Sequence, residues 1–384
     1  TAVHARGWCP RQIPYPSCGG LQMIPVARPF VGEEETAAIA EVMQSGMLAQ
    51  GEVVTKFEEE FATYCGVDHG VAVNSGTAAL HAALLALGIG PGDEVIVPSF
   101  TFIATATSVS MCGARPVMVD IEKSTYTIDP EAVRSRVCAE TKAIIGVHLY
   151  GQPFDIDPVH EICEENDLLL IEDCAQAHGA TYHGKKVGGF GSAGCFSFYP
   201  TKNMTSGEGG MVTTDDEELA SHVRRIINHG QSDKYLHTEL GYNFRMTNIS
   251  AAIGRVQLNK LDRMNAKRQA NADYYTANLN SPGIAPPITR AGGTHVYHQY
   301  VIDVGKECPL SRDGLMAHLR EKGIGSAVHY PMPVHRQPLY AGDGNRDSCP
   351  LSDRASRQVL SLPVHPGIGR EECAYITGII NGVR

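Results

Sequence analysis

The chain has 384 residues, of which 43% are hydrophobic and 19% charged, and its formal net charge is −10. This length and balance predict a globular protein with two domains, and the acidic charge disfavours a nucleic acid or an anionic membrane as partner. No run of about 18 apolar residues predicts a membrane span, and no signal peptide is expected. The eleven cysteines form no CxxC pair, which favours a reducing, cytoplasmic location.

The first half of the chain alternates between strand and helix patterns. Residues 1–22 have no hydrophobic periodicity and predict an extension outside the fold. Two helices are then expected, one from Glu33 to Gly46 and one over Thr55–Tyr64. The strands expected next are Gly70–Val73, Glu94–Pro98, Pro116–Asp120, Ala143–Leu149 and Leu168–Glu172. The helices between them are Ala78–Leu87, a segment ending near Cys112, Pro130–Val137 and Ile156–Glu165. This alternation predicts an α/β fold with a mostly parallel sheet flanked by helices.

The second half of the chain predicts a different arrangement. Phe196, Phe198 and Tyr199 indicate a strand that Pro200 stops, and a short strand follows over Met211–Thr213. Residues 229–243 are polar and irregular. Thr247 is expected to cap a long helix to about Ala277 that links the domains. Beyond it we expect strands at Gln299–Val304 and Ser326–His329, and helices at Ser311–Lys322 and from Arg370. The predicted domains are therefore a large one over 23–255 and a smaller α+β one over 256–384.

Polar residues follow several of the predicted strands. Parallel sheets bind ligands beyond the carboxyl ends of their strands, which places Ser75, Phe102, Asp173 and Lys202 around one crevice. Taken one at a time, each has an ordinary explanation as well. Lys202 is either a solvated loop lysine or the amine that binds an aldehyde cofactor. The turn Asn74–Thr77 is either a helix N-cap or a phosphate site.

Three further features of the sequence have both a functional and an ordinary interpretation. Asp173 ends an apolar run and is a helix N-cap, a member of an internal salt bridge or the partner of a protonated pyridine nitrogen. The stretch Gly189–Gly194 matches G-x-G-x-x-G but opens no helix, so it predicts a flexible turn and no dinucleotide site. A two-histidine metal site at His329 and His335 is a rival interpretation that we do not favour; no metal is expected.

Six segments together resemble one family. In chain order they are NSGTAALHAAL, VPSFTFIATA, EDCAQAHGA, FSFYPTKNMTSGEGG, GYNFRMTNISAAIG and HYPMPVHRQ. Their order and separations are similar to those of the sugar-nucleotide aminotransferases of the DegT–DnrJ–StrS type. The resemblance covers the chain from about Met23 to its end. It implies a pyridoxal 5'-phosphate (PLP) dependent transferase of fold type I, acting as a homodimer with shared active sites.

The resemblance also implies a role for each matching residue. Lys202 would bind the aldehyde of PLP, Asp173 would pair with the pyridine nitrogen, and Gln176 would lie near the ring hydroxyl. The residues that would complete the cofactor site are Phe102 against the ring, Gly76, Thr77 and Ser197 at the phosphate, and Asn243 reaching the phosphate from the partner subunit. His329, Tyr330 and His335 would lie near the substrate.

The implied reaction moves an amino group from L-glutamate to a nucleotide-linked keto-sugar in two half-reactions. The run from Met204 to Gly210, with Glu208 within it, favours a 4-keto-6-deoxy sugar and a perosamine-type product for a polysaccharide or glycan. Three alternatives stay open: a dehydratase, a transaminase for a cyclitol or an aromatic precursor, and a regulatory relative without catalysis. Lys202 argues against the first, and the intact Lys202, Asp173 and Gln176 argue against the last.

Overall fold

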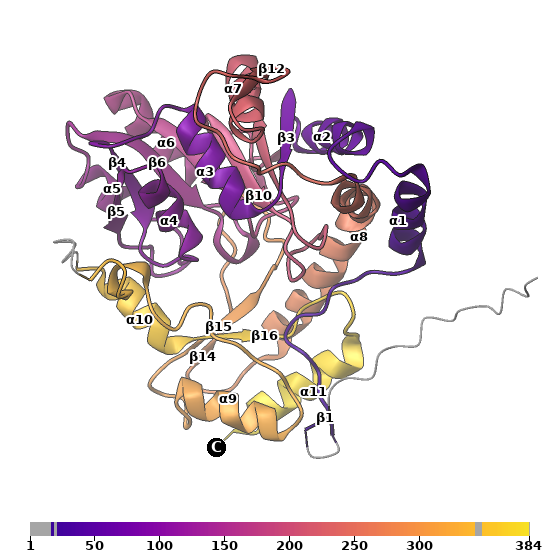
Figure 1. The fold of residues 1–384 in the computed structure, drawn as a ribbon. Coiled ribbons are helices and arrows are strands. Elements are labelled where there is room, and N and C mark those ends of the chain that lie inside the picture. Colours follow the sequence, from indigo (N-terminus) through magenta and orange to yellow (C-terminus); the bar gives the residue numbers. More distant parts are fainter. Residues whose placement is uncertain (1–16, 19–20, 342–347, 384) are drawn as a thin grey trace, which may run out of the picture.

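A seven-stranded sheet forms the centre of the larger part of the molecule. Figure 1 shows helices around this sheet. The computed structural model describes residues 17–18, 21–341 and 348–383. In spatial order the strands are β3 (His69–Val73), β11 (Gly210–Thr214), β10 (Ala193–Ser197), β7 (Leu169–Asp173), β6 (Thr141–Val147), β4 (Glu94–Pro98) and β5 (Arg115–Val119). Only β11 runs antiparallel to its neighbours. The predicted α/β class with a mostly parallel sheet is confirmed.

Helices cover both faces of this sheet because successive residues of each strand point to opposite sides. On one face Val71, Val95 and Ile145 pack under α3 (Gly76–Ala86), α4 (Ala104–Met111) and α7 (Glu217–Ile226). On the other face Ala72, Ile96 and Ile144 pack under a second set of helices. That set comprises α2 (Glu52–Cys65), α5 (Pro130–Arg134), α6 (Ile156–Asn166) and the start of α8 (Asn248–Asn278).

The smaller part of the molecule contains the antiparallel sheet β14 (Ile284–Ala285), β15 (Tyr300–Val304) and β16 (Val359–Leu362). Helices α9 (Arg312–Glu321) and α11 (Arg370–Asn381) and the end of α8 pack against it around a separate apolar core. Figure 1 shows α8 running from the large sheet to this region. Thr247 caps α8 as expected, its side chain accepting a hydrogen bond from the Ser250 amide. The domain limits stay a prediction.

The remaining elements lie at the edges and in the connections. They are β1 (Ser17–Cys18), β2 (Leu21–Gln22), α1 (Glu33–Ser45), β8 (Thr181–Tyr182), β9 (Lys185–Lys186), β12 (Gln231–Asp233), β13 (Leu236–His237), α10 (Pro350–Gln358) and two 3₁₀ turns, Leu149–Gly151 and Val334–Arg336. Helices α1 and α2 end at Gly46 and Gly66, both in the left-handed conformation that favours glycine. Among the described residues, no helix has the length and apolar character of a membrane span.

Three local predictions differ from the structure. The stretch expected to be irregular before Asn243 contains the short hairpin β12–β13. Residues 326–329 form no strand, and only an isolated bridge joins Ala327 to Ser361. The turn over 189–194 is not a loose loop, because the Phe190 and Gly191 amides donate to the buried Glu172 carboxylate. The last two differences depend on partners that lie 18 residues or more away in the sequence, whereas the hairpin pairs residues close together.

Candidate active site

The N-terminus of α3 is packed tightly against the end of β10. Ser75 caps the helix by accepting a hydrogen bond from the Ala78 amide, 3.1 Å away. Gly76 is the first helical residue, and a Cβ placed on it would lie 2.6 Å from the Cβ of Ser197. Only glycine therefore allows this approach. The arrangement brings Gly76, Thr77 and Ser197 together where helix amides and the helix dipole favour an anion.

Asp173 is a buried carboxylate that forms no ion pair with any residue in the described part of the chain. Its side chain is 6% exposed. Oδ2 accepts a 2.8 Å hydrogen bond from the Thr105 hydroxyl, and Oδ1 accepts one of 3.1 Å from the Ala175 amide. Burial raises the pKa of Asp173, and these two donors and the charge of Lys202 oppose that rise. A buried carboxylate with neutral donors alone retains the capacity to pair with a cation.

Lys202 lies in the turn after β10, and its amide donates to the Tyr199 carbonyl over 2.9 Å. Burial lowers the pKa of its amine to about 8, although the negative charge of Asp173 acts in the opposite direction. A substantial fraction of the amine is therefore neutral near pH 8, which is the form that can attack an aldehyde. The structure thus brings the predicted amine and the predicted carboxylate into electrostatic contact.

Three histidines around Lys202 are kept neutral. Burial lowers the pKa of His178 to about 3 and that of His329 to about 4, and the charge of Lys202 lowers both further. The pKa of His298 falls well below its usual value for the same two reasons. Only His329 was selected from the sequence. His178 follows Asp173 by five residues and could have been noticed, whereas nothing near His298 in the sequence points to this site.

Aromatic side chains and the amide of Gln176 form a connected network at the candidate site. Phe102 is 54% exposed, and its ring centroid lies 6.0 Å from that of Tyr330. Gln176 Nε2 donates to the Tyr330 hydroxyl over 2.9 Å, and Gln176 Oε1 accepts from the Tyr150 amide over 2.7 Å. The Tyr150 hydroxyl in turn donates to the His329 carbonyl. Phe102, Gln176, His329 and Tyr330, which are far apart in the sequence, are therefore neighbours.

His335 and Asn243 have other surroundings. The His335 ring is buried, shares a hydrogen bond with the Ser99 hydroxyl and lies 3.4 Å from an Asp353 oxygen. His329 instead hydrogen-bonds Ser361, so the two histidines have different partners.

Asn243 is exposed, and its carbonyl accepts a 3.3 Å hydrogen bond from the Asn74 side chain. The main chain at Asn243 thus lies beside the turn that begins α3.

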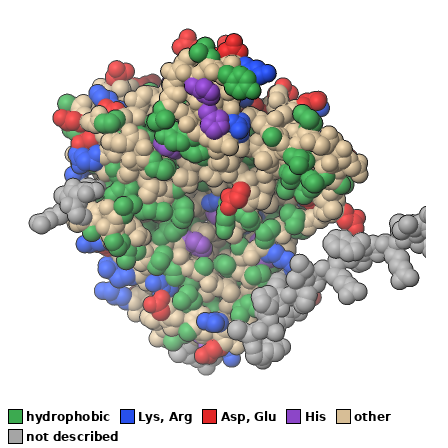
Figure 2. Space-filling model, viewed as in Figure 1, with side chains coloured by type: hydrophobic (Ala, Val, Ile, Leu, Met, Phe, Trp, Pro, Cys, Tyr) green, Lys and Arg blue, Asp and Glu red, His purple; other side chains and the backbone are tan. Residues whose placement is uncertain are grey.

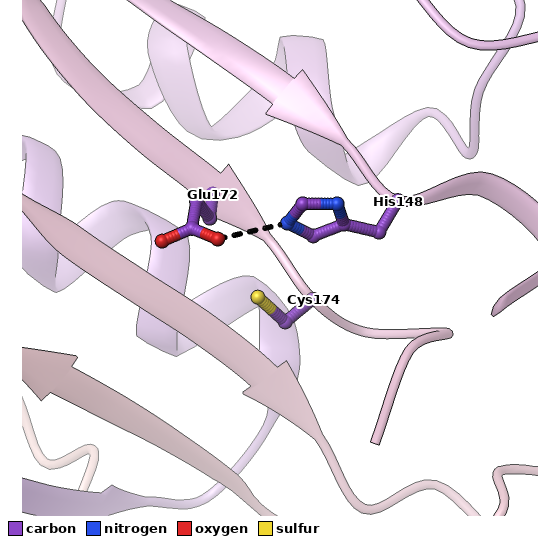
Figure 3. A group of neighbouring side chains, drawn as sticks. All are labelled: His148, Glu172 and Cys174. Atoms are coloured by element: carbon purple, nitrogen blue, oxygen red, sulfur yellow. Dashed lines mark hydrogen bonds and ion pairs between the residues drawn. The ribbon is translucent and has the colours of Figure 1, made fainter. Parts of the chain in front are cut away.

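A second buried carboxylate, Glu172, has a full set of donors. Its oxygens accept hydrogen bonds from the Gly188, Phe190 and Gly191 amides and lie 3.0 Å from His148 Nε2. Figure 3 shows the Glu172 carboxylate directed at the His148 ring, with Cys174 beside them. These three residue types can bind a metal. Because all the acceptor positions of Glu172 are used within the chain, we interpret the cluster as structural.

Comparison with known proteins decides the family. The sequence profile of the DegT/DnrJ/EryC1/StrS aminotransferase family matches residues 29–381. This chain belongs to that family. It is 44% identical over 346 residues to a dTDP-3-amino-3,4,6-trideoxy-alpha-D-glucose transaminase of Streptomyces venezuelae, covering 89% of this chain and 90% of the relative. It is 42% identical over 368 residues to a GDP-perosamine synthase of Caulobacter vibrioides, covering 94% and 99%.

A solved structure supports the cofactor. The PLP form of the sugar aminotransferase Spr1654 of Streptococcus pneumoniae superposes with a TM-score of 0.90 at 29% identity, covering 94% of this chain and 98% of that one. The family member described here is a PLP-dependent aminotransferase. Its residues fit that group: the start of α3, where Gly76 approaches Ser197 closely, favours a phosphate, and the buried Asp173 carboxylate forms no ion pair with a described residue.

Proposed function

We propose that this aminotransferase transfers the amino group of L-glutamate to a nucleotide-linked keto-sugar, with a 4-keto-6-deoxy sugar as the first candidate. The observation that carries the chemistry is the placement of Lys202, whose pKa burial lowers to about 8, where its charge interacts with that of the buried Asp173. Two relatives that each align with about nine-tenths of the chain or more carry names of nucleotide-sugar enzymes, which supports the substrate class. The run 204–210 supports the position of amination.

When bound, PLP supplies an aldehyde that takes up the amino group and a cationic ring that withdraws electrons from the reacting carbon. We propose that Gly76, Thr77 and Ser197 hold its phosphate at the start of α3. Phe102, whose side chain is exposed beside Tyr330 and so available for contact, would pack against the ring. Asp173 keeps the ring nitrogen protonated, and Gln176 donates its second amide hydrogen to the ring hydroxyl.

Lys202 has two tasks in this proposal. Its neutral amine would hold the aldehyde of PLP, and as a free amine it would act as the base that takes a proton from the substrate carbon. The neutral rings of His178, His298 and His329 favour this role, because charged rings nearby would compete for a proton and repel a cationic amine. We assign His329 and Tyr330 to the substrate side, and His335 to holding its segment through Ser99.

We further propose a homodimer in which Asn243 donates to the phosphate in the partner's site. Large hydrophobic side chains are exposed at Phe102, Tyr235 and Leu240, and Figure 2 shows hydrophobic side chains gathered in the middle of the face drawn. Such surfaces are typical of subunit contacts. The Asn243 main chain contacts its own Asn74, so a role within its own subunit is the competing arrangement.

Subunit complementation distinguishes these arrangements. Lys202→Ala chains should be inactive and Asn243→Ala chains inactive or weakened when each is assayed separately. If the sites are shared, mixed dimers place both defects in one site and leave the other intact, so that activity partly returns. If each chain builds its own site, mixing restores nothing. The same chains mixed with themselves are the control.

The substrate assignment is tested with a panel of amino acceptors. The purified enzyme is incubated with L-glutamate and, in separate reactions, with 4-keto-6-deoxy and 3-keto nucleotide sugars, a keto-cyclitol and an aromatic precursor. We expect the largest kcat/KM with a 4-keto-6-deoxy sugar nucleotide, and 2-oxoglutarate as co-product. A preference for the cyclitol or the aromatic acceptor would replace the proposed substrate class. A cytoplasmic location stays a prediction.

A further inference from the structure

Two threonine hydroxyls lie behind Asp173 and have no place in the roles described above. The Thr105 hydroxyl donates to Asp173 Oδ2 over 2.8 Å, and the Thr101 and Thr105 hydroxyl oxygens are 3.0 Å apart. Thr101 is 3% exposed, Thr105 is fully buried, and Asp173 is 6% exposed. The three side chains therefore form a row of hydrogen bonds that water does not reach.

The chemistry of the row fixes its direction. An ionised carboxylate only accepts hydrogen bonds, so Thr105 must donate its single hydroxyl hydrogen to Asp173. The Thr105 oxygen can then accept the hydrogen of Thr101. Hydrogen bonds aligned in this way polarise and strengthen one another. The result is a charge-assisted bond on one Asp173 oxygen that still leaves acceptor positions on the carboxylate.

Another hydroxyl of α4 shows the bond that Thr105 forgoes. Ser108 donates to the Ala104 carbonyl at 2.9 Å, which is the common local bond of a helical serine or threonine. Ser110 lies 3.4 Å from the Ala106 carbonyl and also shares a 3.0 Å hydrogen bond with the Tyr340 hydroxyl. Thr105 bonds a side chain 68 residues away. The segment that presents Phe102 thus also reaches the carboxylate at the end of β7.

We propose that Thr105 is a positioning residue that keeps Asp173 ionised and aimed at the ring nitrogen of PLP, with Thr101 supporting it from behind. This inference rests on the proposed pairing of Asp173 with that nitrogen. Without the Thr105 hydroxyl, one oxygen of the buried carboxylate loses its donor. Proton sharing then moves from the ring nitrogen toward Asp173, and the carboxylate is free to rotate.

The test compares four single variants of the full chain: Thr105→Val, which keeps the branched shape, Thr105→Ser, Thr101→Val and the control Ser108→Ala. PLP affinity is measured by titrating the cofactor-free protein and following the visible absorbance. Protonation of the ring is measured from the ¹⁵N chemical shift of PLP labelled at its pyridine nitrogen. Thermal melting of the cofactor-free proteins shows whether each variant is folded, and Thr105→Ala replaces Thr105→Val if the latter is not.

Because Thr105→Val removes a hydrogen bond to a charged group, we expect it to weaken PLP binding by roughly 10- to 100-fold. The ¹⁵N signal should move toward that of an unprotonated pyridine. Thr105→Ser should restore both readouts to within about threefold, and Thr101→Val should have a smaller effect of the same sign. Ser108→Ala should change neither readout. A wild-type affinity and ¹⁵N signal in Thr105→Val would overturn the inference, as would losses of equal size in Thr105→Val and Ser108→Ala.

One further variant separates this inference from the proposal on which it rests. If Asp173→Asn loses affinity and ring protonation but Thr105→Val does not, the inference about Thr105 alone is wrong. If Asp173→Asn also retains both, the proposed pairing of Asp173 with the ring nitrogen is wrong.

Discussion

The two faces of β7 carry adjacent buried carboxylates with opposite surroundings. Glu172 points to the side of α6, where three backbone amides and His148 use its acceptor positions. Asp173 points to the side of α4, where one hydroxyl and one amide are its hydrogen-bond donors. The chain lowers the pKa of Glu172 despite burial, whereas the pKa of Asp173 remains raised. A saturated carboxylate stabilises the fold, and an under-partnered one is available to a ligand.

Removing the Lys202 amine, which lies near Asp173, should have the largest effect on transamination. Lys202→Ala should lower transamination by at least about 10⁴-fold, because the proposed function assigns both cofactor binding and proton transfer to this one side chain. Steady-state assays measure the loss, and melting of the cofactor-free protein shows that the fold is retained. In the wild-type enzyme, borohydride reduction and peptide mapping should place the cofactor on Lys202. Labelling of a different lysine would contradict the assignment.

Changing the under-partnered carboxylate should impair function more than folding. Asp173→Asn should lower the single-turnover rate by roughly 10²- to 10³-fold, the range for losing one preorganised electrostatic partner, and PLP should dissociate more easily. The cofactor-free variant should melt near the wild-type temperature, because a cation-free buried carboxylate is not a net source of stability. Near-normal single-turnover rates would show that Asp173 is structural.

Changing Glu172, the carboxylate whose acceptor positions are all used, should impair folding more than function. Glu172→Gln loses the charge that three amides and His148 share, and breaking such a buried network costs about 3 kcal/mol of unfolding free energy. The protein that remains folded should retain PLP affinity, since Glu172 faces away from the crevice. Denaturant unfolding and PLP titration measure the two quantities. Equal loss of PLP affinity in Glu172→Gln and Asp173→Asn would remove the distinction between the two faces.

The smallest effect concerns the pH dependence of stability. Burial lowers the pKa of the Lys202 amine in the folded chain from its ordinary value of 10.5 to about 8. Between these values the unfolded chain binds more protons, so the stability of the cofactor-free protein should rise with pH through that window. Lys202→Met removes the group. It should be more stable than wild type at pH 7, and the difference should shrink between pH 8 and 10.5. A constant difference would show that the amine is not buried as described.

The sequence by itself determined the alternation of strands and helices and the residues at the carboxyl ends of the strands. Both follow from local signals: buried runs such as Leu169–Asp173, the caps Ser75 and Thr247, and glycines such as Gly46 that end helices. The six motifs indicated the family and its cofactor, which the comparisons bear out. The roles of single residues at the site stay predictions.

Tertiary structure alone decided how the two carboxylates differ. Nothing in the letters Glu172-Asp173 states which is saturated, because the donors come from Gly188–Gly191 and His148 for one and from α4 for the other. The same holds for two histidines. His335 bonds Ser99, which is 236 residues away, and His298 lies far from Lys202 in the sequence although the charge of Lys202 acts on it. Hydrogen bonds and desolvation depend on which groups meet in space, and the chain brings those groups together only when the sheet and its helices have formed.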